Sequence, residues 1–135
     1  MRGPLRALLV VLAVSAAVPG LWATLAPHSF YAGFPGGAHW VDRLPPYNQH
    51  LVTDVGAFYL AFAVLFAWAA TTLQRALVVP VCVAWSVFSA IHLGYHAAHL
   101  GGFTTADAVG EIVALAVVLA LPAIVIRVAR TNPRS

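Results

Sequence analysis

Six side chains in the sequence have the types and spacings that bind metal ions or carry protons. They are His50, Asp54, His92, His96, His99 and Glu111. Residues three, four or seven positions apart share one face of a helix, so such histidines point their rings the same way. Imidazole and carboxylate form the ligand sets of zinc, iron and copper sites, and carboxylates also orient the rings. The sequence therefore predicts that these six residues line one cup that holds a transition metal ion.

The same six residues leave other interpretations open. No HExxH motif and no paired Glu-x-x-His motif occurs, so the spacing permits a metal site without identifying it. A haem held by His50 and by His92 or His96 is one variant. Because histidine changes charge near neutral pH, a cup without metal would relay protons or hold a quinone or a lipid head group. A purely structural role is the other reading, for example a hydrogen bond between Asp54 and a histidine of the third helix.

Other kinds of chemistry find little support. The single Cys82 excludes an internal disulfide and a thiol pair. No glycine-rich phosphate loop occurs, and Ser86 and Ser89 lie outside any nucleophile motif. The formal net charge is +3, but the basic residues are scattered rather than gathered into a patch. Nucleic acid is therefore not an expected partner.

The elements that would position the six residues are membrane-spanning helices. The chain is 61% hydrophobic and 8% charged, and a soluble chain of 135 residues cannot bury that much apolar surface. Four apolar stretches are each near the ~20 residues that cross a bilayer as a helix. They cover about residues 5–25, 51–71, 76–99 and 105–127. We expect an all-α protein, a four-transmembrane-helix up-down bundle that forms one domain over residues 1–135 and contacts lipid.

The segment of about residues 27–50 differs from the apolar stretches. It is rich in proline, glycine and aromatic residues, among them Phe34, Trp40 and Tyr47. Proline and glycine disfavour a regular helix, and aromatic side chains suit the head-group layer of a membrane. We expect an ordered extracytoplasmic flap that lies on the membrane surface above the cup.

Capping residues mark the start of two helices. Asn48 precedes the second apolar stretch and is expected to accept a hydrogen bond from the first turn. Thr104 and Asp107 have the spacing of a capping box at the start of the fourth helix. For Asp107 this structural role is favoured over a role in the cup.

The arginines predict the orientation of the bundle. Six of the seven arginines fall on one side of the predicted membrane, and only Arg43 falls on the other. The six are Arg2, Arg6, Arg75, Arg127, Arg130 and Arg134. Because basic residues in short loops stay in the cytoplasm, both chain ends are expected there. Every histidine and carboxylate then falls on the extracytoplasmic side. The absence of lysine favours a GC-rich bacterial genome and a bacterial cytoplasmic membrane.

The first apolar stretch also has features of a secretory signal peptide. Arg2 and Arg6 precede a Leu/Val/Ala run with small residues near Ala17, where cleavage would leave three helices. The apolar run continues to Leu25, which is longer than the usual signal segment. A retained first helix is therefore the favoured interpretation.

Two motifs carry a resemblance to a known group. The stretch from Tyr47 to Leu60, YNQHLVTDVGAFYL, and the stretch from His92 to Leu100, HLGYHAAHL, resemble small bacterial four-helix membrane proteins similar to the DoxX-like superfamily. The resemblance implies the four-helix fold and the membrane location. Name-giving members are tied to sulfur-compound oxidation, with electrons passed to quinone, or to membrane oxidoreductase complexes. Sulfur chemistry is not carried over, because the lone Cys82 offers no thiol pair.

Two functions from different classes follow from these observations. The first is an outward-facing His/carboxylate site that binds a transition metal or a quinone in a redox-related process. The second is a non-enzymatic membrane subunit whose polar cluster fixes helix packing and docks a membrane-protein partner or a second copy of the chain. The sequence leaves open whether the protein is an enzyme.

Overall fold

The computed structural model describes residues 2–44 and 46–131, and these residues form helices and connecting loops without a strand. The elements are α1 (Arg2–Leu25), α2 (Pro27–Gly33), α3 (Gln49–Thr72), α4 (Arg75–Ala98) and α5 (Thr105–Arg130). All but the short α2 are long and apolar enough to cross a membrane. The chain is a multi-pass membrane protein, and the predicted all-α four-helix bundle is confirmed.

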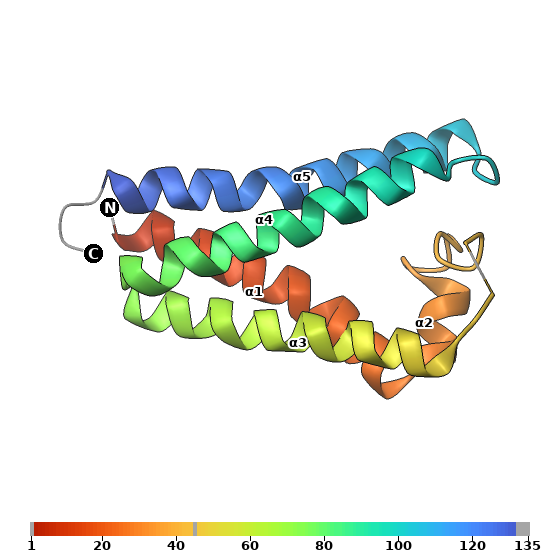
Figure 1. The fold of residues 1–135 in the computed structure, drawn as a ribbon, viewed down its shortest axis with the longest axis horizontal. Helices are drawn as coiled ribbons and strands as arrows, with labels where there is room; N and C mark the ends of the chain where they lie inside the picture. Colours follow the sequence, from red (N-terminus) through yellow and green to blue (C-terminus); the bar gives the residue numbers. More distant parts are fainter. Residues whose placement is uncertain (1, 45, 132–135) are drawn as a thin grey trace.

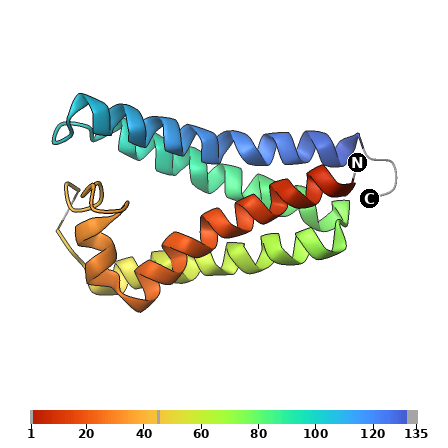
Figure 2. The ribbon, with the colours of Figure 1, turned by 180° about the vertical axis from the view of Figure 1, so that it is seen from behind.

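The four long helices form two antiparallel pairs. α1 packs along α3, and α4 packs along α5. Figures 1 and 2 show that the pairs lie together near the two chain ends and diverge toward the opposite end, where α2 and the loop after it lie. We call these the termini end and the loop end of the bundle.

Interlocking apolar side chains close the termini end. Leu5, Leu9 and Leu12 of α1 are fully buried there, as are Phe66 of α3 and Val125 of α5. The indole of Trp85, from the middle of α4, contacts the rings of Phe62 and Phe66, with centroids 5.1 and 5.6 Å apart. This core joins all four long helices. The positions that form it follow the helical repeat of each apolar stretch.

A close crossing of α1 and α3 holds this pair together toward the loop end. A Cβ atom added at Gly56 of α3 would lie 2.6 Å from Thr24 Oγ1 and 2.8 Å from the Thr24 backbone nitrogen. Only glycine fits so near another backbone. Small residues permit this kind of approach in membranes, where packing rather than water exclusion holds helices together.

The outer faces of the long helices are apolar. Large hydrophobic side chains are exposed on each of them, including Val18, Val64, Ile91 and Val109. The described arginines at the start of α1, the start of α4 and the end of α5 lie at the termini end, whereas Arg43 lies at the loop end. Arg134 lies outside the described residues. An apolar belt with charges at its ends is the surface expected of a membrane protein.

The loop end contains a helix that the sequence did not predict. α2 forms within the segment expected to resist regular structure. Pro27 occupies its first turn, where proline costs no hydrogen bond. The rings of Phe30 and Phe34 lie 5.9 and 6.0 Å from Trp22 of α1, which anchors α2 against the bundle.

Both predicted helix caps are confirmed. Asn48 Oδ1 accepts a hydrogen bond from the Leu51 N–H of α3 at 3.1 Å. Thr104 Oγ1 accepts from the Asp107 N–H of α5 at 3.1 Å and donates to Asp107 Oδ2 at 2.9 Å. The third membrane-spanning helix, α4, ends at Ala98, next to the expected end at about residue 99, and His99 is its C-cap.

Candidate functional site

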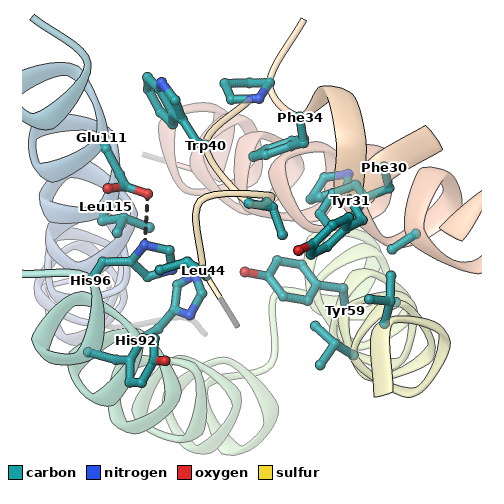
Figure 3. A pocket seen from close by; sticks show the side chains of 18 of the residues that line it. Phe30, Tyr31, Phe34, Trp40, Leu44, Tyr59, His92, His96, Glu111 and Leu115 are labelled. Atoms are coloured by element: carbon teal, nitrogen blue, oxygen red, sulfur yellow. Dashed lines mark ion pairs between the residues drawn. The ribbon is translucent and has the colours of Figure 1, made fainter. Parts of the chain in front are cut away.

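A cavity of about 620 Å³ lies between the diverging helix pairs at the loop end. Its walls come from all five helices and from the loop between α2 and α3. Figure 3 looks into it and shows mainly rings and apolar side chains, among them Phe30, Phe34, Trp40 and Leu115. The space exists because the two pairs separate above the core near Trp85 and Phe62.

A buried histidine–carboxylate pair joins α4 and α5 at one wall of the cavity. His96 Nδ1 lies 2.7 Å from Glu111 Oε1, and their side chains are 9% and 3% exposed. The ring nitrogen does not point along a hydrogen-bond direction, and Glu111 Oε2 has no hydrogen-bond partner among the described residues. Contact with the imidazole offsets part of the large cost of placing a lone carboxyl group among apolar helices.

His92 extends the polar wall into the cavity. Its ring centroid lies 4.5 Å from that of His96, and it stacks on Phe88 at 5.3 Å with an interplanar angle of 17°. In Figure 3 the His92 ring faces the cavity beside the His96–Glu111 pair. Phe88 fixes this ring on one side, so His92 presents its nitrogens to whatever the cavity holds.

Tyrosines supply polar atoms on the opposite wall. Tyr59 of α3 packs its ring against Trp85 and Phe88, with centroids 5.4 and 5.3 Å away. In Figure 3 the hydroxyls of Tyr59 and of Tyr31 from α2 point across the cavity toward the α4 wall. The Tyr31 hydroxyl donates to the Asp42 carbonyl oxygen at 3.4 Å. A ligand in the cavity would therefore have the Tyr59 hydroxyl on one side and imidazoles on the other.

Deeper along α4 two further polar groups lack partners. Trp85 Nε1 and Ser89 Oγ are buried and have no hydrogen-bond partner in the part of the chain that the structure describes. Both residues line the cavity. A buried donor without a partner costs about 1–3 kcal/mol, and a polar ligand atom or a water would relieve that cost.

Three of the six predicted site residues line this cavity, and three do not. His50 and Asp54 pair with each other along α3 at 3.1 Å, with side chains 87% and 60% exposed. The prediction that they line the cup is therefore wrong, as is the proposed contact from Asp54 to a histidine of α4. The reason is the rotation of α3, which turns Val55, Gly56 and Tyr59 inward.

His99 also lies outside the cavity. Its ring stacks on Tyr95 with centroids 4.1 Å apart, and its Nδ1 lies 2.7 Å from the Tyr95 carbonyl oxygen. Because α4 ends before His99, the residue leaves the helical face that His92 and His96 share. The predicted three-histidine stripe is therefore a two-histidine stripe in the structure.

The geometry gives no direct support to a metal centre. Among residues 2–44 and 46–131, no group of three or more His, Cys, Asp or Glu side chains is arranged to hold a metal ion. The structure also does not fit a haem held by His50 and by His92 or His96, because His50 faces away from the other two histidines. The prediction of a transition metal therefore remains without a matching site.

Sequence reasoning missed a polar network that ties the loop to α5. Arg43 Nη1 lies 3.2 Å from Asp107 Oδ2 and donates to the Gly102 carbonyl oxygen at 3.4 Å. The Trp40 indole N–H donates to Asp107 Oδ1 at 3.3 Å. The Arg43 guanidinium also lies 4.9 Å from the centre of the Phe103 ring. Asp107 thus caps α5 and also holds the loop through Arg43 and Trp40. The sequence signalled this second role through the position of Arg43 alone, which is apart from the other arginines.

No protein family, curated protein or solved structure matches the chain in comparisons of sequence and fold. The resemblance to DoxX-like proteins therefore stays a prediction.

Proposed function

We propose that this membrane protein binds a quinone, or a molecule of quinone-like shape with a flat polar head and an apolar tail, in the loop-end cavity. The observation that carries the proposal is an apolar, aromatic-walled cavity of about 620 Å³ with its polar atoms confined to a few side chains. Small-molecule sites have volumes of about 300–1,000 Å³ and this same composition. An apolar tail would follow the aromatic walls, and the head would lie between Tyr59 and His92.

The charge of the cavity supports a neutral head group. No lysine or arginine is among the described residues that line it. Arg43, the nearest candidate, is bound to Asp107. A phosphate head group would enter without a cation to neutralise it, at a cost of several kcal/mol. A quinone carries no charge and needs only hydrogen bonds to its oxygens, which imidazole and tyrosine hydroxyl groups supply.

The same residues support a redox-related process. A quinone gains protons when it is reduced and releases them when it is oxidised. His92, His96 and Glu111 are side chains that carry protons, and they lie together on one wall of the cavity. In this proposal the protein holds the head group and exchanges its protons, while a membrane partner exchanges its electrons.

Tryptophan fluorescence provides the test, because Trp40 and Trp85 line the cavity. A short-tailed quinone should quench the purified protein in detergent in a saturable way. We expect His92→Ala to weaken binding about tenfold, which corresponds to about 1.4 kcal/mol for a lost polar contact. The matched control is His50→Ala, which removes an exposed histidine and should bind like the parent. Quenching that does not saturate would contradict the proposal. So would a loss of affinity in His50→Ala as large as the loss in His92→Ala.

We further propose that both chain ends lie in the cytoplasm of a bacterium and that the cavity faces outward. The arginines at the termini end support this orientation through the positive-inside rule. Reporter fusions at either terminus should read cytoplasmic, and a reporter inserted after Gly37 should read extracytoplasmic. The reverse pattern would place the cavity on the cytoplasmic side.

The alternative function is a non-enzymatic subunit in which the His96–Glu111 pair fixes helix packing and the loop end docks a partner. The near-complete burial of the pair favours this reading. Glu111→Gln separates the two functions. A packing role predicts that Glu111→Gln lowers the unfolding temperature and that the parent protein itself binds no quinone. A site role predicts that the parent binds quinone and that the folded Glu111→Gln variant binds it less tightly, whether or not its unfolding temperature falls.

A further inference from the structure

The segment from Trp40 to Leu44, which we call the strap, covers part of the loop-end cavity. Trp40, Val41 and Leu44 all line it. In Figure 3 the strap crosses the middle of the view, between the α4–α5 wall and the wall formed by α2 and α3. The strap belongs in sequence to the connection between α2 and α3, yet its contacts reach across to the other helix pair.

Those contacts are polar and accessible to solvent. The Arg43–Asp107 ion pair, which we call the latch, has side chains 25% and 27% exposed. The Trp40 indole adds one hydrogen bond to Asp107, and its ring lies over Gly110, where an added Cβ would come within 3.4 Å. Partly exposed ion pairs are weak and are screened by salt. The strap is thus held by interactions that open far more readily than the interlocked core at the termini end.

We propose that the strap is a gate on the cavity and that the latch between Arg43 and Asp107 holds it closed. Opening breaks the latch and lifts Trp40 and Leu44 away from α5, which joins the cavity to the aqueous phase at the loop end. The gate concerns access to the cavity and is independent of which molecule the cavity binds. Lids of this kind commonly set the rates at which ligands enter and leave.

The first test measures access without any ligand. Leu115, an α5 residue that lines the cavity, is replaced by cysteine in a Cys82→Ala background, and a small charged thiol reagent labels it in detergent. Arg43→Gln should raise the labelling rate about tenfold, because it removes the latch. High salt should accelerate labelling of the parent and have little effect on the Arg43→Gln variant. The matched control is Asp54→Asn, which removes an ion pair on the exposed face of α3.

Equal labelling rates with and without the latch would overturn the gate. So would acceleration by Asp54→Asn of the same size, because that would indicate general loosening of the bundle.

The second test closes the gate instead of opening it. A Cβ added at Gly102 lies 3.9 Å from the Cβ of Arg43, within the range that disulfides span. Oxidation of an Arg43→Cys/Gly102→Cys variant should lock the strap and slow both quinone association and dissociation at least about tenfold, with reductant restoring both rates. Equal exchange rates in the two redox states would overturn the gate. A parent protein that binds no quinone would overturn the proposed function alone, and the labelling rates would still decide the gate.

Discussion

The two ends of the bundle are built on different principles. At the termini end, leucines of α1 interlock with Phe66 and Trp85, and apolar packing joins all four long helices. At the loop end the helix pairs diverge around a cavity. The His96–Glu111 pair joins α4 and α5 within one wall, and the Arg43–Asp107 latch ties the strap to α5 at the mouth. The packed core and the proposed binding site therefore lie in separate halves of the bundle.

The difference shows how a four-helix membrane protein of this size can contain a cavity. Inside a bilayer, lipid is as apolar as the side chains, so helices stay together where they pack closely. The Gly56 crossing and the aromatic core provide that packing within α1–α3 and at the termini end. The α4–α5 pair is then free to lean away, and polar side chains that would be costly against lipid line the opening.

The largest difference in unfolding free energy should appear when one aromatic ring is truncated in each half. Phe66→Ala removes a fully buried ring from the core and should cost about 3–5 kcal/mol of unfolding free energy. Phe30→Ala removes a half-buried ring that borders an existing cavity, and its cost should be clearly smaller. Chemical or thermal unfolding in detergent measures both. Equal losses would mean that the two halves do not differ in packing.

A smaller loss of unfolding free energy should follow when a side chain is added where α1 and α3 cross. Gly56→Ala places a methyl group against the Thr24 backbone and should cost about 1–3 kcal/mol, the usual price of overpacking. Gly94→Ala is the matched control, because no atom lies within 4 Å of its added Cβ. We expect Gly94→Ala to unfold at the parent temperature or slightly above it. An unaffected Gly56→Ala would show that α1 and α3 do not depend on this contact.

The helices and caps were predictable because they follow local rules. Apolar stretches of membrane-spanning length and the cap residues Asn48 and Thr104 specify their own structure. The segregation of histidines and carboxylates to one end also followed from the sequence. Spacing along one helix, however, says nothing about the direction in which that helix faces.

The site was predicted in part, because its geometry depends on contacts between distant residues. The contact of Gly56 with α1 contributes to the rotation of α3, which turns Asp54 outward and Tyr59 inward. The latch joins residues 64 positions apart. Because α3 turns its carboxylate outward, ionisable groups from two helices rather than three meet at the candidate site, which α4 and α5 form with Tyr59 opposite.

The two carboxylates that were predicted to act together should have unequal effects on stability. Glu111→Gln leaves buried His96 without its ion-pair partner. It should lower the free energy of unfolding by about 1–3 kcal/mol and should also weaken quinone binding. Asp54→Asn acts on an exposed pair within one helix and should change stability by less than about 0.5 kcal/mol, with quinone affinity unchanged. Unfolding curves and quinone titrations of the same samples test this. A larger effect from Asp54→Asn would contradict the account, because it would mean that the functional face of α3 carries Asp54 rather than Tyr59.

Photolabelling tests the central claim, that the loop-end cavity is a binding site, most directly. A short-tailed quinone with a photoreactive group would be bound to the protein in detergent, crosslinked by light and located by mass spectrometry. We expect labels on cavity residues of α4 and α5, from Phe88 to His96 and from Glu111 to Val118, and we expect an excess of unmodified quinone to abolish them. Labels spread over the outward faces of the helices, around His50 and Asp54 or along Val64, and unaffected by competitor would contradict the claim.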